Sequence, residues 1–100
     1  MRYKFFFCFI ILFIFSACSQ ATSQADPTGE EIYLARCAAC HGDNLEGKVG
    51  PKIGMDSSAW SMPNSYWIQT ITMGKGSMPG QTLTDEEVYL IIEYIREGQK

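Results

Sequence analysis

Apolar residues recur at helical spacing in three parts of this 100-residue chain, and no part alternates as a half-buried strand would. The most regular stripe lies within residues 88–95, where isoleucine, leucine and valine repeat three and four positions apart. Thr84 and Glu87 form a capping box in front of this stripe, and Gly98 follows it as a helix stop. The pattern predicts an all-α fold with three main helices, of which this C-terminal one is the most clearly marked.

The other two helices are predicted nearer the N-terminus. Residues 28–39 begin with Thr28 as an N-cap, carry acidic side chains in the first turn and continue with spaced apolar positions. Residues 66–73 carry apolar side chains on one face, and glycines directly after them end that helix. Between the two helices, residues 42–62 are punctuated by glycines and Pro51, so we expect a long irregular loop there.

The N-terminus has the pattern of an export signal and not of a folded domain. A short basic start precedes an apolar run over residues 5–15, which is shorter than the roughly 20 residues that span a bilayer. Ser16, Ala17 and Cys18 then resemble a lipobox, in which the cysteine is lipidated and becomes the new N-terminus. The chain is therefore predicted to carry a lipoprotein-type signal peptide.

This prediction divides the chain into three parts. Residues 1–17 form the signal peptide, residues 18–27 a flexible polar tether, and residues 28–100 the folded domain. A lipidated Cys18 would anchor the exported domain to the extracytoplasmic side of a membrane. The alternative is ordinary cleavage a few residues later, which would give a soluble periplasmic or secreted protein.

Cys37, Cys40 and His41 form a C-x-x-C-H motif at the end of the first predicted helix. On a helical run, residues three and four positions apart share one face, so both thiols and the imidazole can meet one flat ligand. This motif is the haem-attachment signal, in which the thiols bond to the two vinyl groups and the imidazole binds the iron. We predict one covalently attached haem c per chain.

Other uses of the two cysteines explain the motif less well. A thioredoxin-type dithiol would require a strand-rich βαβ context, and a structural zinc site would require four nitrogen or sulfur ligands. A plain disulfide would leave His41 without a role. The chain has four cysteines, and Cys8 leaves with the signal peptide while Cys18 takes lipid. Haem attachment then leaves no free thiol, which suits an oxidising compartment.

Composition limits the remaining functional classes. The formal net charge is −3 at pH 7, and the basic residues at positions 2 and 4 leave with the leader, so nucleic-acid binding is disfavoured. A domain of about 80 residues forms only a marginally stable hydrophobic core unless a disulfide, metal or cofactor adds to its stability. A covalent haem would supply the apolar mass that the chain lacks.

The iron needs a sixth ligand, and His41 is the sole histidine. Methionine is the natural partner, because its thioether favours ferrous iron and raises the reduction potential. We favour Met78, since the glycines and proline around it allow a loop to approach a ring closely. Met62, which also precedes a proline, is the rival. Met55 has no positional signal, and Met73 is expected to fill the core.

Together these residues resemble a class I c-type cytochrome. The resemblance lies in Gly29-x-x-x-Tyr33 before the C-x-x-C-H motif, in Gly50-Pro51, in the loop around Met78, and in the terminal helix up to Tyr94. It implies that the Pro51 carbonyl accepts a hydrogen bond from the histidine ring, and that Gly29 and Tyr94 mark a helix crossing. It also implies the small cytochrome c fold, with three main helices packed around one covalently attached haem.

The resemblance extends to function. With its lipobox, the chain is similar to small lipid-anchored monohaem cytochromes of Gram-positive bacteria, which implies a monomeric one-electron carrier and not an enzyme. The implied partners are a donor dehydrogenase or quinol-oxidising complex and an acceptor oxidase in a respiratory chain. A haem-based sensor, or a haem-bearing subunit of an oxidoreductase complex, is the alternative.

Overall fold

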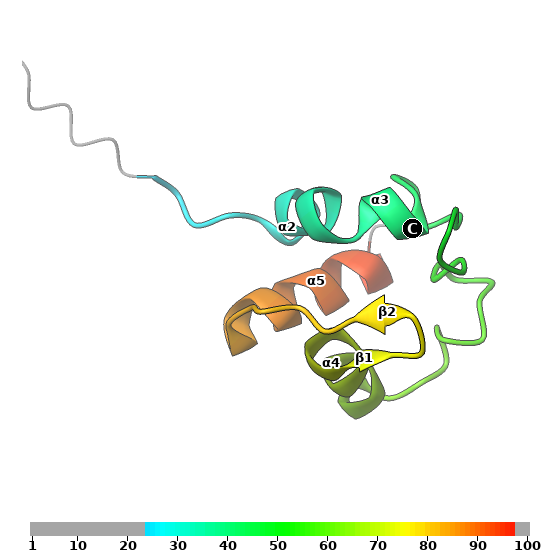
Figure 1. The fold of residues 1–100 in the computed structure, drawn as a ribbon. Coiled ribbons are helices and arrows are strands. Elements are labelled where there is room, and N and C mark those ends of the chain that lie inside the picture. The colour runs from blue at the N-terminus through cyan, green and yellow to red at the C-terminus, as the bar shows by residue number, and fades with distance from the viewer. Residues whose placement is uncertain (1–23, 98–100) are drawn as a thin grey trace, which may run out of the picture.

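The computed structural model describes residues 24–97 of the chain (Figure 1). The elements are α2 (Gly29–Arg36), α3 (Ala38–His41), α4 (Asn64–Met73), β1 (Gly74–Lys75), β2 (Met78–Pro79) and α5 (Asp85–Glu97). The predicted signal peptide over 1–17, the lipidation site Cys18 and the helix stop Gly98 lie outside the described residues. Residues 24–27, the described part of the predicted tether, are exposed and have no regular secondary structure. Within 24–97, none of the helices has both the length and the apolar character that crossing a bilayer requires.

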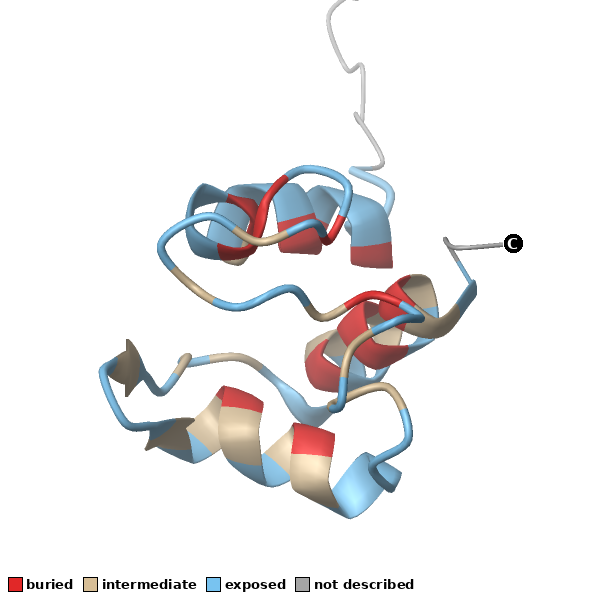
Figure 2. Ribbon diagram, turned by 90° about the vertical axis from the view of Figure 1, so that its right-hand side faces the viewer, coloured by how far each residue is buried: buried red, intermediate tan, exposed pale blue. Residues whose placement is uncertain are grey.

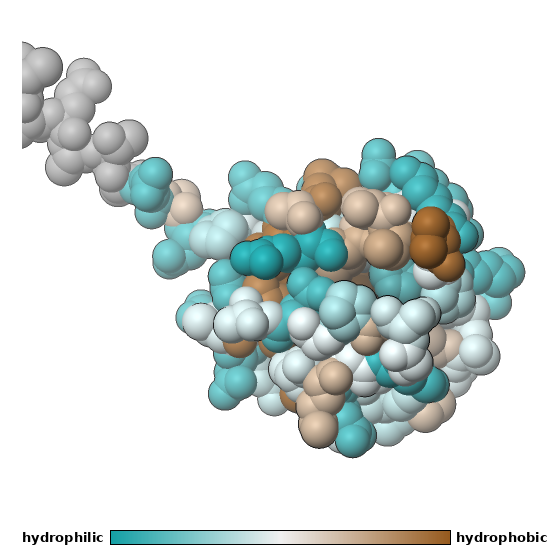
Figure 3. Space-filling view, in the orientation of Figure 1, coloured by the Kyte–Doolittle hydropathy of each residue, from teal (hydrophilic) through white to brown (hydrophobic). Residues whose placement is uncertain are grey.

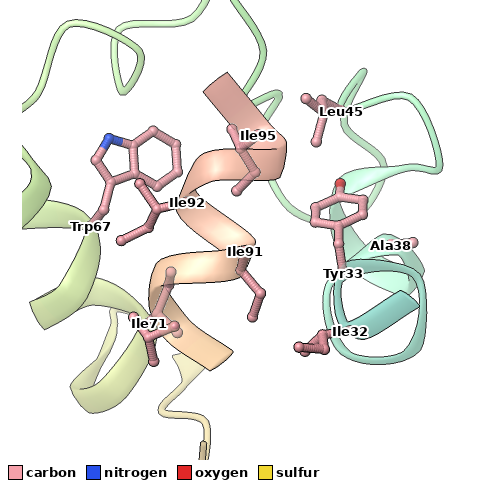
Figure 4. Close-up of a cluster of buried hydrophobic side chains, with 10 residues drawn as sticks. Ile32, Tyr33, Ala38, Leu45, Trp67, Ile71, Ile91, Ile92 and Ile95 are labelled. Atoms are coloured by element: carbon pink, nitrogen blue, oxygen red, sulfur yellow. The ribbon is translucent and has the colours of Figure 1, made fainter. Parts of the chain in front are cut away.

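Helix α5 lies between α2 and α4 and packs against both (Figure 1). Its buried stripe consists of Val88, Ile91, Ile92 and Ile95, as the sequence pattern predicted. Figure 4 shows these isoleucines between the apolar side chains of α2 on one side and those of α4 on the other. Buried positions on all three helices face this interior (Figure 2). The predicted capping box is present, since the Thr84 and Glu87 backbone N–H groups donate to each other's side chains.

The crossing of α2 and α5 depends on a glycine. A Cβ atom added to Gly29 would overlap the backbone carbonyl of Leu90 and lie 3.1 Å from Cβ of Tyr94. One turn further along α2, the Tyr33 ring packs on the Tyr94 ring with centroids 5.4 Å apart. The crossing implied by the family resemblance is therefore confirmed.

The first predicted helix is divided in two. Helix α2 ends at Arg36, Cys37 has a φ of −118°, and α3 then continues from Ala38 to His41. Thr28 caps α2 as predicted, and Glu31 completes a second capping box, which lowers the pKa of its carboxyl group through hydrogen bonds to Thr28. Helix α3 ends at a glycine with a φ of +86°, a conformation that other residues rarely adopt.

The loop over 42–62 is irregular, as predicted, but it is folded back onto α3. The Gly47 N–H donates to the His41 carbonyl at 2.7 Å, and the Gly50 N–H donates to the Cys40 carbonyl at 2.8 Å. Leu45 contributes to the core and is only 2% exposed. The first half of the loop therefore has ordering contacts that belong to the protein itself.

Helix α4 begins at Asn64, directly after Pro63, and ends at Met73, where Gly74 caps it with a φ of +79°. The strands β1 and β2 form a short antiparallel hairpin, in which Gly74 pairs with Pro79 and Lys75 with Met78. The prediction of no strand is wrong for this hairpin, because two-residue strands are too short to alternate visibly. The expectation that Met73 fills the core is also wrong, since its side chain is 74% exposed.

Candidate haem site

A cavity of about 540 Å³ lies between α3, the following loop, α4, the hairpin and α5. Apolar side chains from three elements form much of its wall, including Ile53, Trp67, Ile71, Ile91 and Ile95. Five residues predicted to serve the cofactor also lie in this wall: Cys37, Cys40, His41, Pro51 and Met78. Segments 40 residues apart in the chain thus meet around one cavity of a size suited to a large planar ligand.

The two cysteines reach the cavity from either end of the first turn of α3. Cys37 is half-buried, Cys40 is exposed, and both are free thiols. Burial raises the pKa of the Cys37 thiol to about 11, although the nearby Arg36 charge acts in the opposite direction. Both sulfurs are therefore available at the cavity for bonds to a ligand.

The His41 ring is buried and fixed by the loop that follows it. Its Nδ1 lies 2.7 Å from the backbone oxygen of Pro51, which can only accept, so Nδ1 carries the proton and donates it. Gly50 lies against the same ring, where an added Cβ would be 3.0 Å from Cε1. The hydrogen bond implied by the resemblance is present, and it leaves Nε2 with a free lone pair for a metal.

The methionines differ in their position relative to the cavity. Met78 is half-buried and lines the cavity from strand β2. Met55, Met62 and Met73 are 52%, 37% and 74% exposed, and none of these three belongs to the cavity wall. The backbone carbonyl of Met62 is instead bound by Arg96 at the end of α5. Met78 is therefore the described methionine that shares a cavity with His41.

A buried polar atom in the wall provides a test of whether a haem fits. Trp67 is 5% exposed, lines the cavity, and its Nε1–H has no hydrogen-bond partner among the described residues. Buried donors are nearly always satisfied in folded proteins, so this one requires an acceptor from outside the chain. A haem carries carboxylate groups on a flat apolar ring, and the wall offers this donor together with apolar faces and two thiols. These residues fit a haem.

One contact in the cavity wall was not predicted from the sequence. Lys75 on β1 donates a hydrogen bond to the Tyr66 hydroxyl on α4 at 2.8 Å, and both residues line the cavity. The two residues are nine positions apart on different elements, so no periodic pattern links them. Their pairing follows from the hairpin, which the sequence pattern did not indicate either.

Comparison with known proteins bears on the same residues. The family "Cytochrome C oxidase, cbb3-type, subunit III" matches residues 24–95. Cytochrome c6 of Gracilaria tenuistipitata var. liui is 37% identical over 102 residues, which covers 95% of this chain and 93% of that protein. The chain belongs to the class I c-type cytochromes. Cytochrome c-551 of Bacillus subtilis (strain 168) is 33% identical over 70 residues.

A solved structure supports the same fold. The crystal structure of cytochrome cL from Hyphomicrobium denitrificans matches 72% of this chain with 40% sequence identity and a TM-score of 0.57. The matched part is 46% of that chain and 60% of Bacillus cytochrome c-551, so this cytochrome spans less than two thirds of either protein.

Family membership settles the cofactor. Cytochromes of this family carry covalently bound haem c, one per chain, and Cys37 and Cys40 stand at the position of the paired cysteines. The relatives named cytochrome c6, cytochrome c-551 and cytochrome c-L are electron-carrier cytochromes and not enzymes. The predictions of the family, of haem c and of a non-enzyme are therefore confirmed.

Proposed function

We propose that this cytochrome is a one-electron carrier in a membrane-associated respiratory chain. The observation that carries the proposal is the placement of His41 and Met78 in the wall of one cavity, together with both cysteines. When bound, the haem supplies the one-electron ferric–ferrous couple of its iron. If His41 and Met78 both bound the iron, no coordination position would remain for a substrate, which suits electron transfer.

Each of the predicted site residues then has a definite task. Cys37 and Cys40 would hold the ring through thioether bonds, and His41 would bind the iron through Nε2. The Pro51 carbonyl fixes the ring orientation of His41 and increases its basicity through the hydrogen bond at Nδ1. Met78 would supply the sixth ligand and favour the ferrous state. Of the three main helices, α4 and α5 would line the haem together with α3, while α2 packs against α5.

Electrons would enter and leave where the site reaches the surface. Cys40 is exposed, and Val49, which also lines the cavity, is 93% exposed. Apolar residues appear on the surface around α2 and α3 in Figure 3, while the hairpin side is mostly neutral or hydrophilic. Contact with the donor dehydrogenase or quinol-oxidising complex, and with the acceptor oxidase, would be brief and small in area.

The N-terminal part of the proposal concerns location. Residues 1–17 act as a signal peptide, Cys18 is lipidated, and residues 18–27 tether the monomeric cytochrome domain (28–100) to the extracytoplasmic side of a membrane. The support is the lipobox-like sequence before Cys18. The mass of the purified protein tests it, because it reports haem and acyl groups separately; a mass that begins at a later residue without acyl groups would favour the soluble form.

The second candidate function is that of a subunit in an oxidoreductase complex. The matching family is described as a subunit of a cbb3-type oxidase, and the CcoP subunit of Azospirillum brasilense is 32% identical over 79 residues. This chain covers 26% of that subunit's length. Purification from detergent-solubilised membranes separates the candidates, because a shuttle comes away alone whereas a subunit stays with its complex.

The axial ligand is tested by replacing the methionine. Wild-type ferric protein should show the weak red absorption band of sulfur–iron ligation, and Met78→Ala should abolish it and allow the ferrous form to bind carbon monoxide. Met62→Ala is the matched control and should leave both properties unchanged. If Met62→Ala abolishes the band, the ligand assignment is wrong. A high-spin wild type that binds carbon monoxide would favour the haem-based sensor.

A further inference from the structure

The hairpin brings Lys75 and Met78 to the same side. The two residues are directly opposed in the antiparallel pair of β1 and β2, and opposed side chains project from the same face of a sheet. Both residues also line the cavity. Any contact that fixes Lys75 therefore acts next to the Met78 side chain.

Lys75 is fixed by Tyr66 on α4. Its Nζ donates to the tyrosine hydroxyl at 2.8 Å and lies 4.9 Å from the centre of the tyrosine ring. The same hydrogen bond, together with the ammonium charge, lowers the pKa of the Tyr66 hydroxyl. Tyr66 is in turn held against Trp67 by an edge-on ring contact with centroids 6.5 Å apart. The lysine is thus tied to a well-packed part of α4.

The base of the hairpin is held by backbone contacts, but its tip is not. At the base, the Gly74 N–H caps α4 by donating to the Thr70 carbonyl, and the Gln81 N–H donates to the Ile71 carbonyl at 2.8 Å. At the tip, a Cβ added to Gly76 would meet nothing within 4 Å. An isolated two-stranded hairpin is marginally stable in water. Among the described residues, the bond from Lys75 to Tyr66 is the side-chain hydrogen bond that joins the tip to the helix.

We infer that Tyr66 and Lys75 are a positioning pair, which holds the hairpin tip against α4 and sets how readily the Met78 sulfur leaves the iron. The inference rests on the proposed function, in which Met78 is the sixth ligand. Neither residue of the pair binds the iron. Their effect is on the loop that carries the ligand, since releasing the tip lets Met78 swing away from the cavity.

The rate of ligand exchange tests the pair. Ferric holoprotein is mixed with increasing imidazole, and the limiting rate at saturation reports departure of the methionine. Tyr66→Phe removes the hydroxyl and keeps the ring, and Lys75→Leu removes the ammonium without adding a sulfur that could itself bind the iron. Each should raise the limiting rate by about threefold to tenfold, the effect of one hydrogen bond. The double variant should be no faster than the faster single variant, because both changes break the same contact.

Lys48→Leu is the matched control, because it removes the same charge from an exposed residue outside the cavity wall. Its limiting rate should equal that of the wild type. Additive effects of the two single changes, or an equal acceleration in Lys48→Leu, would overturn the inference. The red absorption band of the wild type distinguishes failure of the inference from failure of the proposed function. If the band is present and the variants leave the exchange rate unchanged, only the positioning pair is wrong. With the band absent from the wild type, the ligand assignment is wrong and the inference falls with it.

Discussion

The imidazole of His41 owes its orientation to backbone atoms of the loop that follows it. Pro51 accepts the Nδ1 hydrogen bond, and Gly50 leaves room for the ring. The C-x-x-C-H motif predicted which atoms react, because that chemistry depends on residue type and spacing alone. It did not predict the partner of Nδ1, which came from the family resemblance. No sequence pattern predicted the hydrogen bond from Lys75 to Tyr66, since this bond depends on how the hairpin packs against α4.

Tyr33 gives a prediction at the scale of one hydroxyl group. Its side chain is fully buried, and the hydroxyl donates to the Gly42 carbonyl, directly after His41, at 2.7 Å. Burial also raises the pKa of this hydroxyl, so it remains protonated over the physiological range. Tyr33→Phe leaves that carbonyl with a longer bond of 3.3 Å from the Leu45 N–H. We expect a loss of about 1–2 kcal/mol in the free energy of unfolding, measured by denaturant titration.

Tyr94→Phe is the matched control for this change. Tyr94 packs against the Tyr33 ring but is only half-buried, so its hydroxyl can be satisfied by water. The control should change the free energy of unfolding by less than about 0.5 kcal/mol, as is usual away from buried polar contacts. Equal losses in the two variants would show that the effect does not depend on the Gly42 bond, because Tyr94 lacks that bond and both variants keep their rings.

At the scale of elements, predictability followed the strength of local signals. The start of α5, its buried stripe and its capping box were all predicted, because a cap and a 3.6-residue repeat are properties of the segment itself. The break at Cys37 was not predicted, since no glycine or proline marks it and the residue keeps a nearly helical backbone. The hairpin of β1 and β2 was missed because strands of two residues carry no period.

The crossing of α2 and α5 leads to a prediction in which two effects oppose each other. Gly29→Ala should stabilise an isolated helix, because alanine has the higher helix propensity by about 1 kcal/mol. In this protein the added methyl group would overlap the Leu90 carbonyl, so the helices must separate. Overpacking typically costs about 1–3 kcal/mol, and we expect it to dominate. Thermal unfolding of the holoprotein should therefore show a lower midpoint for Gly29→Ala.

Glu30→Ala controls for helix propensity at the neighbouring, exposed position. It should leave the midpoint close to that of the wild type, because surface substitutions usually change stability by less than about 0.5 kcal/mol. An increased midpoint for Gly29→Ala would mean that the two helices are not in close contact at this glycine.

At the scale of the whole molecule, the fold bears on the choice between Met78 and Met62 as the proposed ligand. Four methionines follow the predicted leader, and sequence context reduced them to Met78 and a rival, Met62. The structure separates the two because distant segments converge on a single cavity, with Met78 in its wall and Met62 outside it. Such convergence is set by the packing of α4 and the hairpin on α5, which no local pattern encodes.

The cavity also predicts how the chain behaves without its cofactor. The cavity of about 540 Å³ is lined largely by apolar side chains, which lose packing contacts when no cofactor fills it. This loss falls on a fold whose total stability, for a typical domain, is only about 5–15 kcal/mol. The haem-free chain should therefore fill the cavity with water or collapse around it, since the core beside Ile71, Ile91 and Ile95 is left without a neighbour.

The double variant Cys37→Ala/Cys40→Ala, which cannot attach haem covalently, makes this measurable. We expect it to lose near-ultraviolet circular dichroism, to keep part of the helical signal in the far ultraviolet, and to unfold without a cooperative transition. Added free haem should restore a cooperative transition, because His41 and the cavity wall are unchanged and binding stabilises the folded state. A sharp transition in the haem-free variant would show instead that the contacts of α2, α4 and α5 suffice, and that the haem occupies a cavity that the polypeptide maintains by itself.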